Sequence, residues 1–145
     1  MKNIIVFIAV IIFLSACNTT GKQLKEKITN ADSVAINYFK GDGTMDTVEG
    51  VKIISDKNIL EQLTSLITAS STAMKNDCGY DGSIHYFKMN RVIQDIDFRM
   101  NEDGCSLFSF LLNGKKEATK LSADAGRLLN VLRKLETSAL PKIGK

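Results

Sequence analysis

The sequence predicts an α+β fold with two layers, in which two helices pack on one face of an antiparallel sheet. Two segments carry apolar residues at helical spacing, and the other apolar segments alternate with a period of two. The last four alternating segments are separated by short turn signals, which is typical of an antiparallel meander. Amphipathic helices need an apolar surface to cover, and one face of the sheet supplies it. The expected element order is β-β-α-β-β-β-β-α.

The first two strands are expected to pair as a hairpin. Val34, Ile36 and Tyr38 share one face of the segment 33–39, and a second strand pattern covers 45–54. The residues between them, 40–43 (KGDG), are a strong turn signal. Gly50 interrupts the second strand, where a glycine often marks a bulge.

A helix is predicted over 57–68, with Asp56 as its N-cap, because a carboxylate can accept a hydrogen bond from a free N–H of the first turn. Its apolar residues form a one-sided stripe made of Ile59, Leu60, Leu63, Leu66 and Ile67. The residues 69–82 show no such stripe and are rich in Ser, Asn, Asp and Gly. They are therefore predicted to form a loop, which includes the sequence NDCGYDG at 76–82.

The four strands of the meander are predicted at 84–89, 92–100, 105–112 and 115–121. Asn113-Gly114 is the clearest hairpin signal, because a type I′ turn needs positive φ at both positions. In the second of these strands Asp95, Asp97 and Arg99 share one face, which we interpret as a solvent-facing charged row. Ser122 is expected to cap a last helix, whose stripe contains Ala125, Leu128, Leu129, Leu132 and Leu135.

The N-terminus has the layout of a secretory signal. Lys2 precedes an uninterrupted apolar run over 4–14. A membrane-spanning helix needs about 20 apolar residues, so this run is too short for a permanent span. Directly after it, Leu14-Ser15-Ala16-Cys17 resembles the lipobox of bacterial lipoproteins. The resemblance implies that residues 1–16 are a lipoprotein signal peptide, which is removed, and that Cys17 is lipidated.

A lipidated Cys17 would anchor the protein in a membrane, because two or more acyl chains hold a protein stably. The domain plan is then a lipidated Cys and tether at 17–31, a single α+β domain at 32–140 and a tail at 141–145. The chain resembles small lipoproteins of Bacteroidota. In lipoproteins of this kind, an Asp directly after the lipidated Cys resembles a signal for retention in the inner membrane. This chain has Asn18 at that position. We expect a lipid anchor in the outer membrane, with the domain facing the periplasm.

The chain has three cysteines, so a lipidated Cys17 leaves the pair Cys78 and Cys105. Two cysteines that remain in an exported chain are expected to form a disulfide, because the compartment is oxidising. The meander supports this pairing, because Cys78 precedes its first strand and Cys105 begins its third, at the same end of the sheet. A reactive thiol or a metal pair would favour C-x-x-C spacing or a nearby His, and neither is present.

Other candidate sites are weak. His85 is the only histidine, so a zinc site rich in His is excluded, and no cofactor or metal is expected. Asp77 and Asp81 miss the calcium-loop pattern at its essential last acid. Ser33 and Thr47 each follow an Asp and precede Val, which resembles a short O-glycosylation site of Bacteroidota.

The net charge is +3, too weak to indicate a nucleic-acid binder. The favoured function is a lipid-anchored envelope module that binds a protein partner, with Tyr80 and Asp81 in the loop as candidate contacts. One alternative is an inhibitor or immunity protein directed against an envelope hydrolase. The other is a small hydrolase that uses Asp95, Asp97 or His85, for which a concave pocket gathering His85 with a carboxylate would be evidence. No catalytic residue is assigned.

Overall fold

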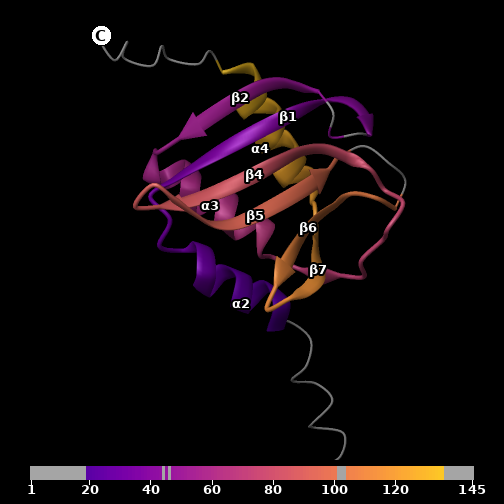
Figure 1. The fold of residues 1–145 in the computed structure, drawn as a ribbon, viewed down its shortest axis with the longest axis horizontal. Coiled ribbons are helices and arrows are strands. Elements are labelled where there is room, and N and C mark those ends of the chain that lie inside the picture. The colour runs from indigo at the N-terminus through magenta and orange to yellow at the C-terminus, as the bar shows by residue number, and fades with distance from the viewer. Residues whose placement is uncertain (1–18, 44, 46, 101–103, 136–145) are drawn as a thin grey trace, which may run out of the picture.

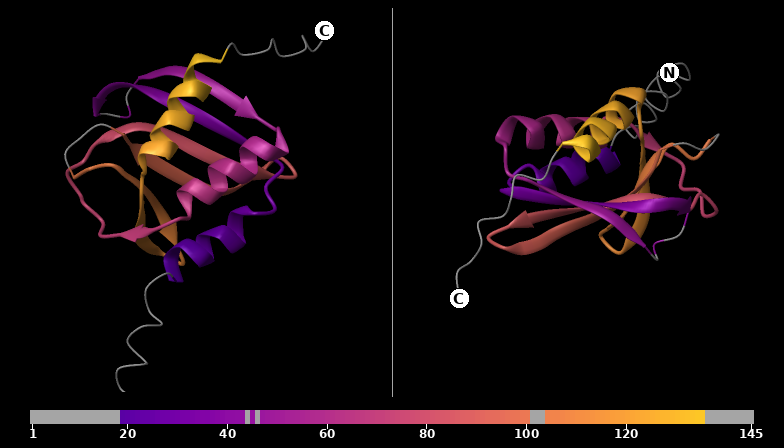
Figure 2. Two further views of the ribbon diagram at one scale, coloured as in Figure 1. Left: turned by 180° about the vertical axis from the view of Figure 1, so that it is seen from behind. Right: turned by 90° about the horizontal axis from the view of Figure 1, so that it is seen from above.

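The computed structural model describes residues 19–135 except 44, 46 and 101–103. These residues form two layers, a seven-stranded antiparallel sheet and three helices that all lie on one face of it (Figures 1 and 2). The predicted two-layer α+β fold is therefore confirmed. The predictions for the signal peptide, for Cys17 and for the tail at 141–145 fall outside the described residues. No helix of the described part is long and apolar enough to cross a bilayer.

The sheet has the strand order β2-β1-β4-β5-β6-β7-β3. Both the predicted hairpin, β1–β2, and the predicted meander, β4 to β7, are present. In the hairpin the pairing passes from Gly50 to Val48 and skips Glu49, which confirms a bulge next to Gly50. The strands are β1 (Ser33–Gly43), β2 (Val48–Ile54), β3 (Ser71–Thr72), β4 (Tyr80–Lys88), β5 (Arg91–Arg99), β6 (Leu107–Leu112) and β7 (Lys115–Lys120).

Two helices match the prediction closely. Helix α3 (Lys57–Ile67) begins after Asp56, whose carboxylate accepts a hydrogen bond from the Ile59 N–H at 3.0 Å. Helix α4 (Ala123–Lys134) begins after Ser122, whose hydroxyl accepts from the Ala125 N–H at 3.2 Å. Each cap satisfies one N–H that the first helical turn leaves without a partner.

The predicted tether at 17–31 is wrong where it is described. Thr19–Ile28 form a third helix, α2, which packs beside α3 at one end of the sheet. Leu24 and Ile28, one helical turn apart, are fully buried in the core that α3, α4 and the sheet share. Two apolar residues in a mostly polar segment gave too weak a stripe to predict a helix. The predicted domain boundary at residue 32 is therefore too late, because the core begins in α2.

The burial of Leu24 leads to a direct test of this correction. We expect Leu24→Ala to lower the free energy of unfolding by about 2–3 kcal/mol, because it leaves a cavity between α2 and the sheet. The control is Lys22→Ala, an exposed position of the same helix, which should change stability little. Urea denaturation of both variants measures the difference. Equal, small losses would mean that α2 is only loosely attached.

Candidate functional site

The face of the sheet opposite the helices, called here the outer face, carries the polar side chains of the inner strands. Alternate residues of a strand point to opposite faces, so Ile36, Ile84 and Ile96 pack toward the helices. Their neighbours point outward. The outward set includes Asn37 from β1, Ser83 and His85 from β4, Asp95 and Asp97 from β5 and Ser109 from β6.

Four of these side chains form one hydrogen-bonded network around His85. Nδ1 of His85 lies 2.6 Å from Oδ1 of Asp95, its cross-strand partner. Nε2 lies 3.0 Å from Nδ2 of Asn37 and 3.1 Å from Oγ of Ser83. An ionised carboxylate only accepts, so Nδ1 carries a proton, and in the neutral imidazole Nε2 then accepts from the amide and the hydroxyl. Ser83, His85 and Asp95 are thus joined in the order of a nucleophile, a base and an orienting acid.

In the described part of the chain, the strands around Ser83 offer this network no free backbone donors for an oxyanion. Such a site needs free donors, often backbone N–H groups, where the oxyanion develops. Ser83 lies in the middle of β4, which pairs with β1 on one side and with β5 on the other. The two ladders occupy the backbone around it, and the Asn37 amide already bonds to His85. In the described part of the chain the network therefore lies where the backbone is paired on both sides.

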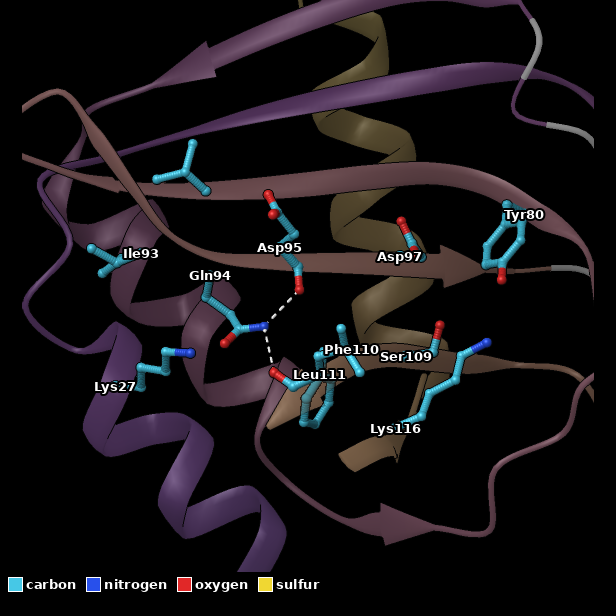
Figure 3. Close-up of a pocket in the computed structure, with 11 residues that line it drawn as sticks. Lys27, Tyr80, Ile93, Gln94, Asp95, Asp97, Ser109, Phe110, Leu111 and Lys116 are labelled. Carbon is cyan, nitrogen blue, oxygen red and sulfur yellow. Dashed lines mark hydrogen bonds between the residues drawn. The ribbon is translucent and has the colours of Figure 1, made fainter. Parts of the chain in front are cut away.

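A groove of about 480 Å³ opens beside this network, where β5 and β6 separate (Figure 3). The pairing of these strands stops at Ile96 and Phe110. Beyond that point the side-chain amide of Gln94 bridges the gap, donating to the carbonyls of Asp95 at 2.7 Å and Leu111 at 3.2 Å. The groove is lined by Lys27, Tyr80, Val92, Ile93, Gln94, Asp95, Asp97, Ser109, Phe110, Leu111 and Lys116.

Two acceptors in the wall of the groove have no partner among the described residues. Gln94 is only 5% exposed, and its Oε1 accepts no hydrogen bond. Asp97 is half-buried, and its carboxylate forms no hydrogen bond or ion pair with another described residue. Burial raises the pKa of Asp97, and the charge of Asp95 raises it further, whereas His85 and Lys116 act in the opposite direction. The groove is therefore lined by a carboxylate whose hydrogen-bonding capacity is unused, while the amide oxygen of Gln94 is buried and closed to solvent.

The structure separates the two residues that the sequence grouped as partner contacts. Tyr80 is half-buried and lines one end of the groove, so it is accessible to a ligand. Asp81 is buried, at 7% exposed, and its carboxylate is engaged at both oxygens. Oδ1 lies 2.9 Å from Nη1 of Arg99, and Oδ2 accepts from the Met100 N–H at 2.7 Å. The prediction of Asp81 as a surface contact is wrong.

The ion pair between Asp81 and Arg99 shows that the predicted solvent-facing row of Asp95, Asp97 and Arg99 is wrong at Arg99. Arg99 is 8% exposed, so it does not face solvent. Strand β4 begins at Tyr80 and not at residue 84, which brings Asp81 into the sheet beside Arg99. The predicted loop 69–82 is also interrupted by β3, which pairs with β7. Part of the predicted loop is therefore an edge strand, and both residues of β3 are exposed.

Cys78 and Cys105 are joined in a disulfide, with their Cα atoms 5.4 Å apart, as the sequence predicted. Gly79 follows in the left-handed conformation at φ 61°, which glycine adopts without a steric cost. Asp77 is exposed. Within the described residues no cluster of three or more His, Cys, Asp or Glu is placed to hold a metal ion.

The two candidate glycosylation residues lie in different settings. Ser33 begins β1, and its hydroxyl lies 3.5 Å from Oδ1 of Asp32. Asp32 also accepts from the Met89 N–H at 2.8 Å through its other oxygen. Thr47 is exposed in the connection between β1 and β2. Of the two, Thr47 is the more accessible to a modifying enzyme.

The sequence reasoning named His85, Asp95, Asp97 and Tyr80 but missed Asn37, Ser83, Gln94 and Ser109. A usable signal was present, since Asp81, Ser83 and His85 alternate with apolar residues in one segment. Comparison with known proteins finds no family model, no curated protein and no solved structure that matches this chain. The candidate site therefore rests on its own geometry.

Proposed function

We propose that this chain is a lipid-anchored binding module of the cell envelope, which holds a protein partner at the groove of its outer face. The lipobox-like Leu14-Ser15-Ala16-Cys17 supports the anchor at Cys17 and the location. The observation that carries the binding function is the groove between β5 and β6, which is lined by residues of the sheet and by Lys27 of α2. Concave surfaces with a few convergent polar groups are where proteins bind ligands.

The composition of the groove supports a protein partner. Tyr80 lies at one end, and tyrosine is enriched where proteins bind one another. Leu111 and Val92 also line the groove and are 63% and 49% exposed, so the groove presents apolar as well as polar surface. An aromatic residue, exposed aliphatic residues and unpaired acceptors together make an amphipathic contact surface. An inhibitor or immunity protein acting on an envelope hydrolase is one form that such a module takes.

Hydrolysis is the second candidate function, and the Ser83–His85–Asp95 network is the observation that favours it. It ranks below binding, because the described backbone around Ser83 is fully paired in the sheet. An activity that depends on this network would be lost in Ser83→Ala. The same variant should leave partner binding through the groove unchanged, since Ser83 is not part of the groove lining.

The test uses one substitution on each layer of the fold. Leu111→Arg places a charged side chain at the groove, and Val131→Arg places the same side chain on exposed α4. After crosslinking in the source envelope, a partner captured by the wild-type chain and by Val131→Arg should be lost from Leu111→Arg. Equal capture by both variants would overturn the groove as the binding surface. Ester hydrolysis that disappears in Ser83→Ala would establish the second function instead.

A further inference from the structure

We infer that protonation of His85 reverses the hydrogen-bonding role of Asn37, so that the outer face presents different groups to solvent at neutral and at acidic pH. With His85 neutral, the amide nitrogen of Asn37 bonds to the imidazole and the amide oxygen faces solvent. With His85 protonated, the oxygen bonds to the imidazole and the nitrogen faces solvent. This switch needs neither the groove nor the lipid anchor of the proposed function.

The Nε2 side of the His85 ring is the part of the network that protonation changes. In the neutral ring Nε2 is an acceptor, and it lies 3.0 Å from Nδ2 of Asn37 and 3.1 Å from Oγ of Ser83. Nδ2 also donates to Oγ of Ser83 at 3.4 Å. Oδ1 of the half-buried Asn37 accepts no hydrogen bond from another described residue, and it is open to solvent. The amide therefore has one end in the network and one end outside it.

A protonated His85 carries a hydrogen on both ring nitrogens. Nε2 and Nδ2 of Asn37 would then face each other as two donors at 3.0 Å, with no acceptor between them. A half turn of the amide about its last side-chain bond puts Oδ1 in the place of Nδ2 and restores a hydrogen bond, and this torsion is broad and roughly two-fold. Ser83 needs no such turn, because a hydroxyl both donates and accepts. Asn37 is therefore the group that must move.

The Nδ1 side of the ring stays in place in both states. Nδ1 carries a hydrogen whether or not the ring is charged, and it lies 2.6 Å from Oδ1 of Asp95. Protonation of His85 turns this contact into an ion pair, and hydrogen bonds between charged groups are stronger than neutral ones. The carboxylate therefore holds the ring while the Asn37 amide turns, and the change stays local.

The charged side chains that face His85 come from β5. In the paired strands His85 lies between Ala35 of β1 and Asp95 of β5, and the outward residues of β1 at this place are uncharged. Asp97 also faces outward from β5, and both His85 and Lys116 of β7 lower its pKa against the effect of burial. The helices lie on the other face of the sheet (Figure 2). Asp97 is therefore the neighbour whose titration must be separated from that of His85.

The exchange changes what a partner meets on the outer face. At neutral pH the surface offers an acceptor, Oδ1 of Asn37, and the negative charge of Asp95. In acid it offers the donor Nδ2, and His85 balances the charge of Asp95. A partner that donates a hydrogen bond at this place is favoured at neutral pH, and a partner that accepts one is favoured in acid.

NMR titration of the isotope-labelled full-length chain in mild detergent follows both groups. His85 is the only histidine, so its ring signals need no further assignment. As the pH falls through the range in which histidine titrates, we expect the side-chain amide signals of Asn37 to shift with the same midpoint as the ring. They should move toward the position of a solvated amide. If they stay unchanged while the ring titrates, the inference is overturned.

Two variants separate His85 from its neighbours, and the backbone amide spectrum reports that each is folded. His85→Gln removes the titrating ring, and the Asn37 signals should then be constant over the same pH range. Asp97→Asn removes the neighbouring carboxyl, and the Asn37 signals should still shift in step with the His85 ring. A shift that persists in His85→Gln, or that disappears in Asp97→Asn, would belong to another group, and the switch would be excluded.

Discussion

Replacing Cys78 and Cys105 together by alanine is expected to lower the free energy of unfolding by about 3–4 kcal/mol. The two residues are 27 apart in sequence, and the crosslink restricts the unfolded chain by closing that loop. The loop contains β4 and β5, which carry Ser83, His85 and Asp95 of the polar network and one wall of the groove. Loss of the disulfide should therefore destabilise the strands on which the candidate site is built.

Urea denaturation of the oxidised wild-type chain, the reduced wild-type chain and the double alanine variant measures this contribution. The reduced wild-type chain should unfold at nearly the same urea concentration as the double variant. Reducing agent should have no effect on the double variant, which serves as the control for effects of the reagent itself. If reduction leaves the wild-type midpoint unchanged, the bond does not stabilise the fold.

The parts of the fold that the sequence predicted are those specified by local patterns. Asp56 and Ser122 cap helices through side chains that reach a backbone N–H three residues ahead, so the signal and the structure are adjacent in sequence. The Asn113-Gly114 turn is equally local, and both residues adopt the positive φ that the turn requires. The disulfide was predictable because only two cysteines remain once Cys17 is assigned to the anchor.

The parts that the sequence did not predict depend on contacts between distant residues. Helix α2 is held by the burial of Leu24 and Ile28 against other elements, and local propensity does not reveal such packing. The pairing of β4 with β5 decides that His85 faces Asp95. A shift of one residue in this register would turn one of them toward the core. The candidate site follows from strand register, which a single sequence does not determine.

Arg99→Met is expected to lower the free energy of unfolding by about 3–5 kcal/mol, because it leaves the carboxylate of Asp81 buried without its charged partner. The side chains of Asp81 and Arg99 are each only 10% exposed, so water cannot replace the lost partner. The Met100 N–H still bonds to Oδ2 of Asp81, but one backbone donor does not neutralise a buried charge.

A second substitution separates the loss of charge pairing from the loss of packing. Asp81→Asn removes the negative charge and keeps an oxygen that can accept from the Met100 N–H, so adding it to Arg99→Met should restore part of the stability. Recovery should be incomplete, because the double variant still lacks the hydrogen bonds of the guanidinium group. Urea denaturation of the wild-type chain, both single variants and the double variant gives the coupling energy between the two positions. If the double variant is as unstable as the sum of the single losses, the ion pair is not the cause. The defect would then lie in packing beside the disulfide. In that case Arg99→Met and the double variant should disturb the groove wall at Tyr80 to the same extent.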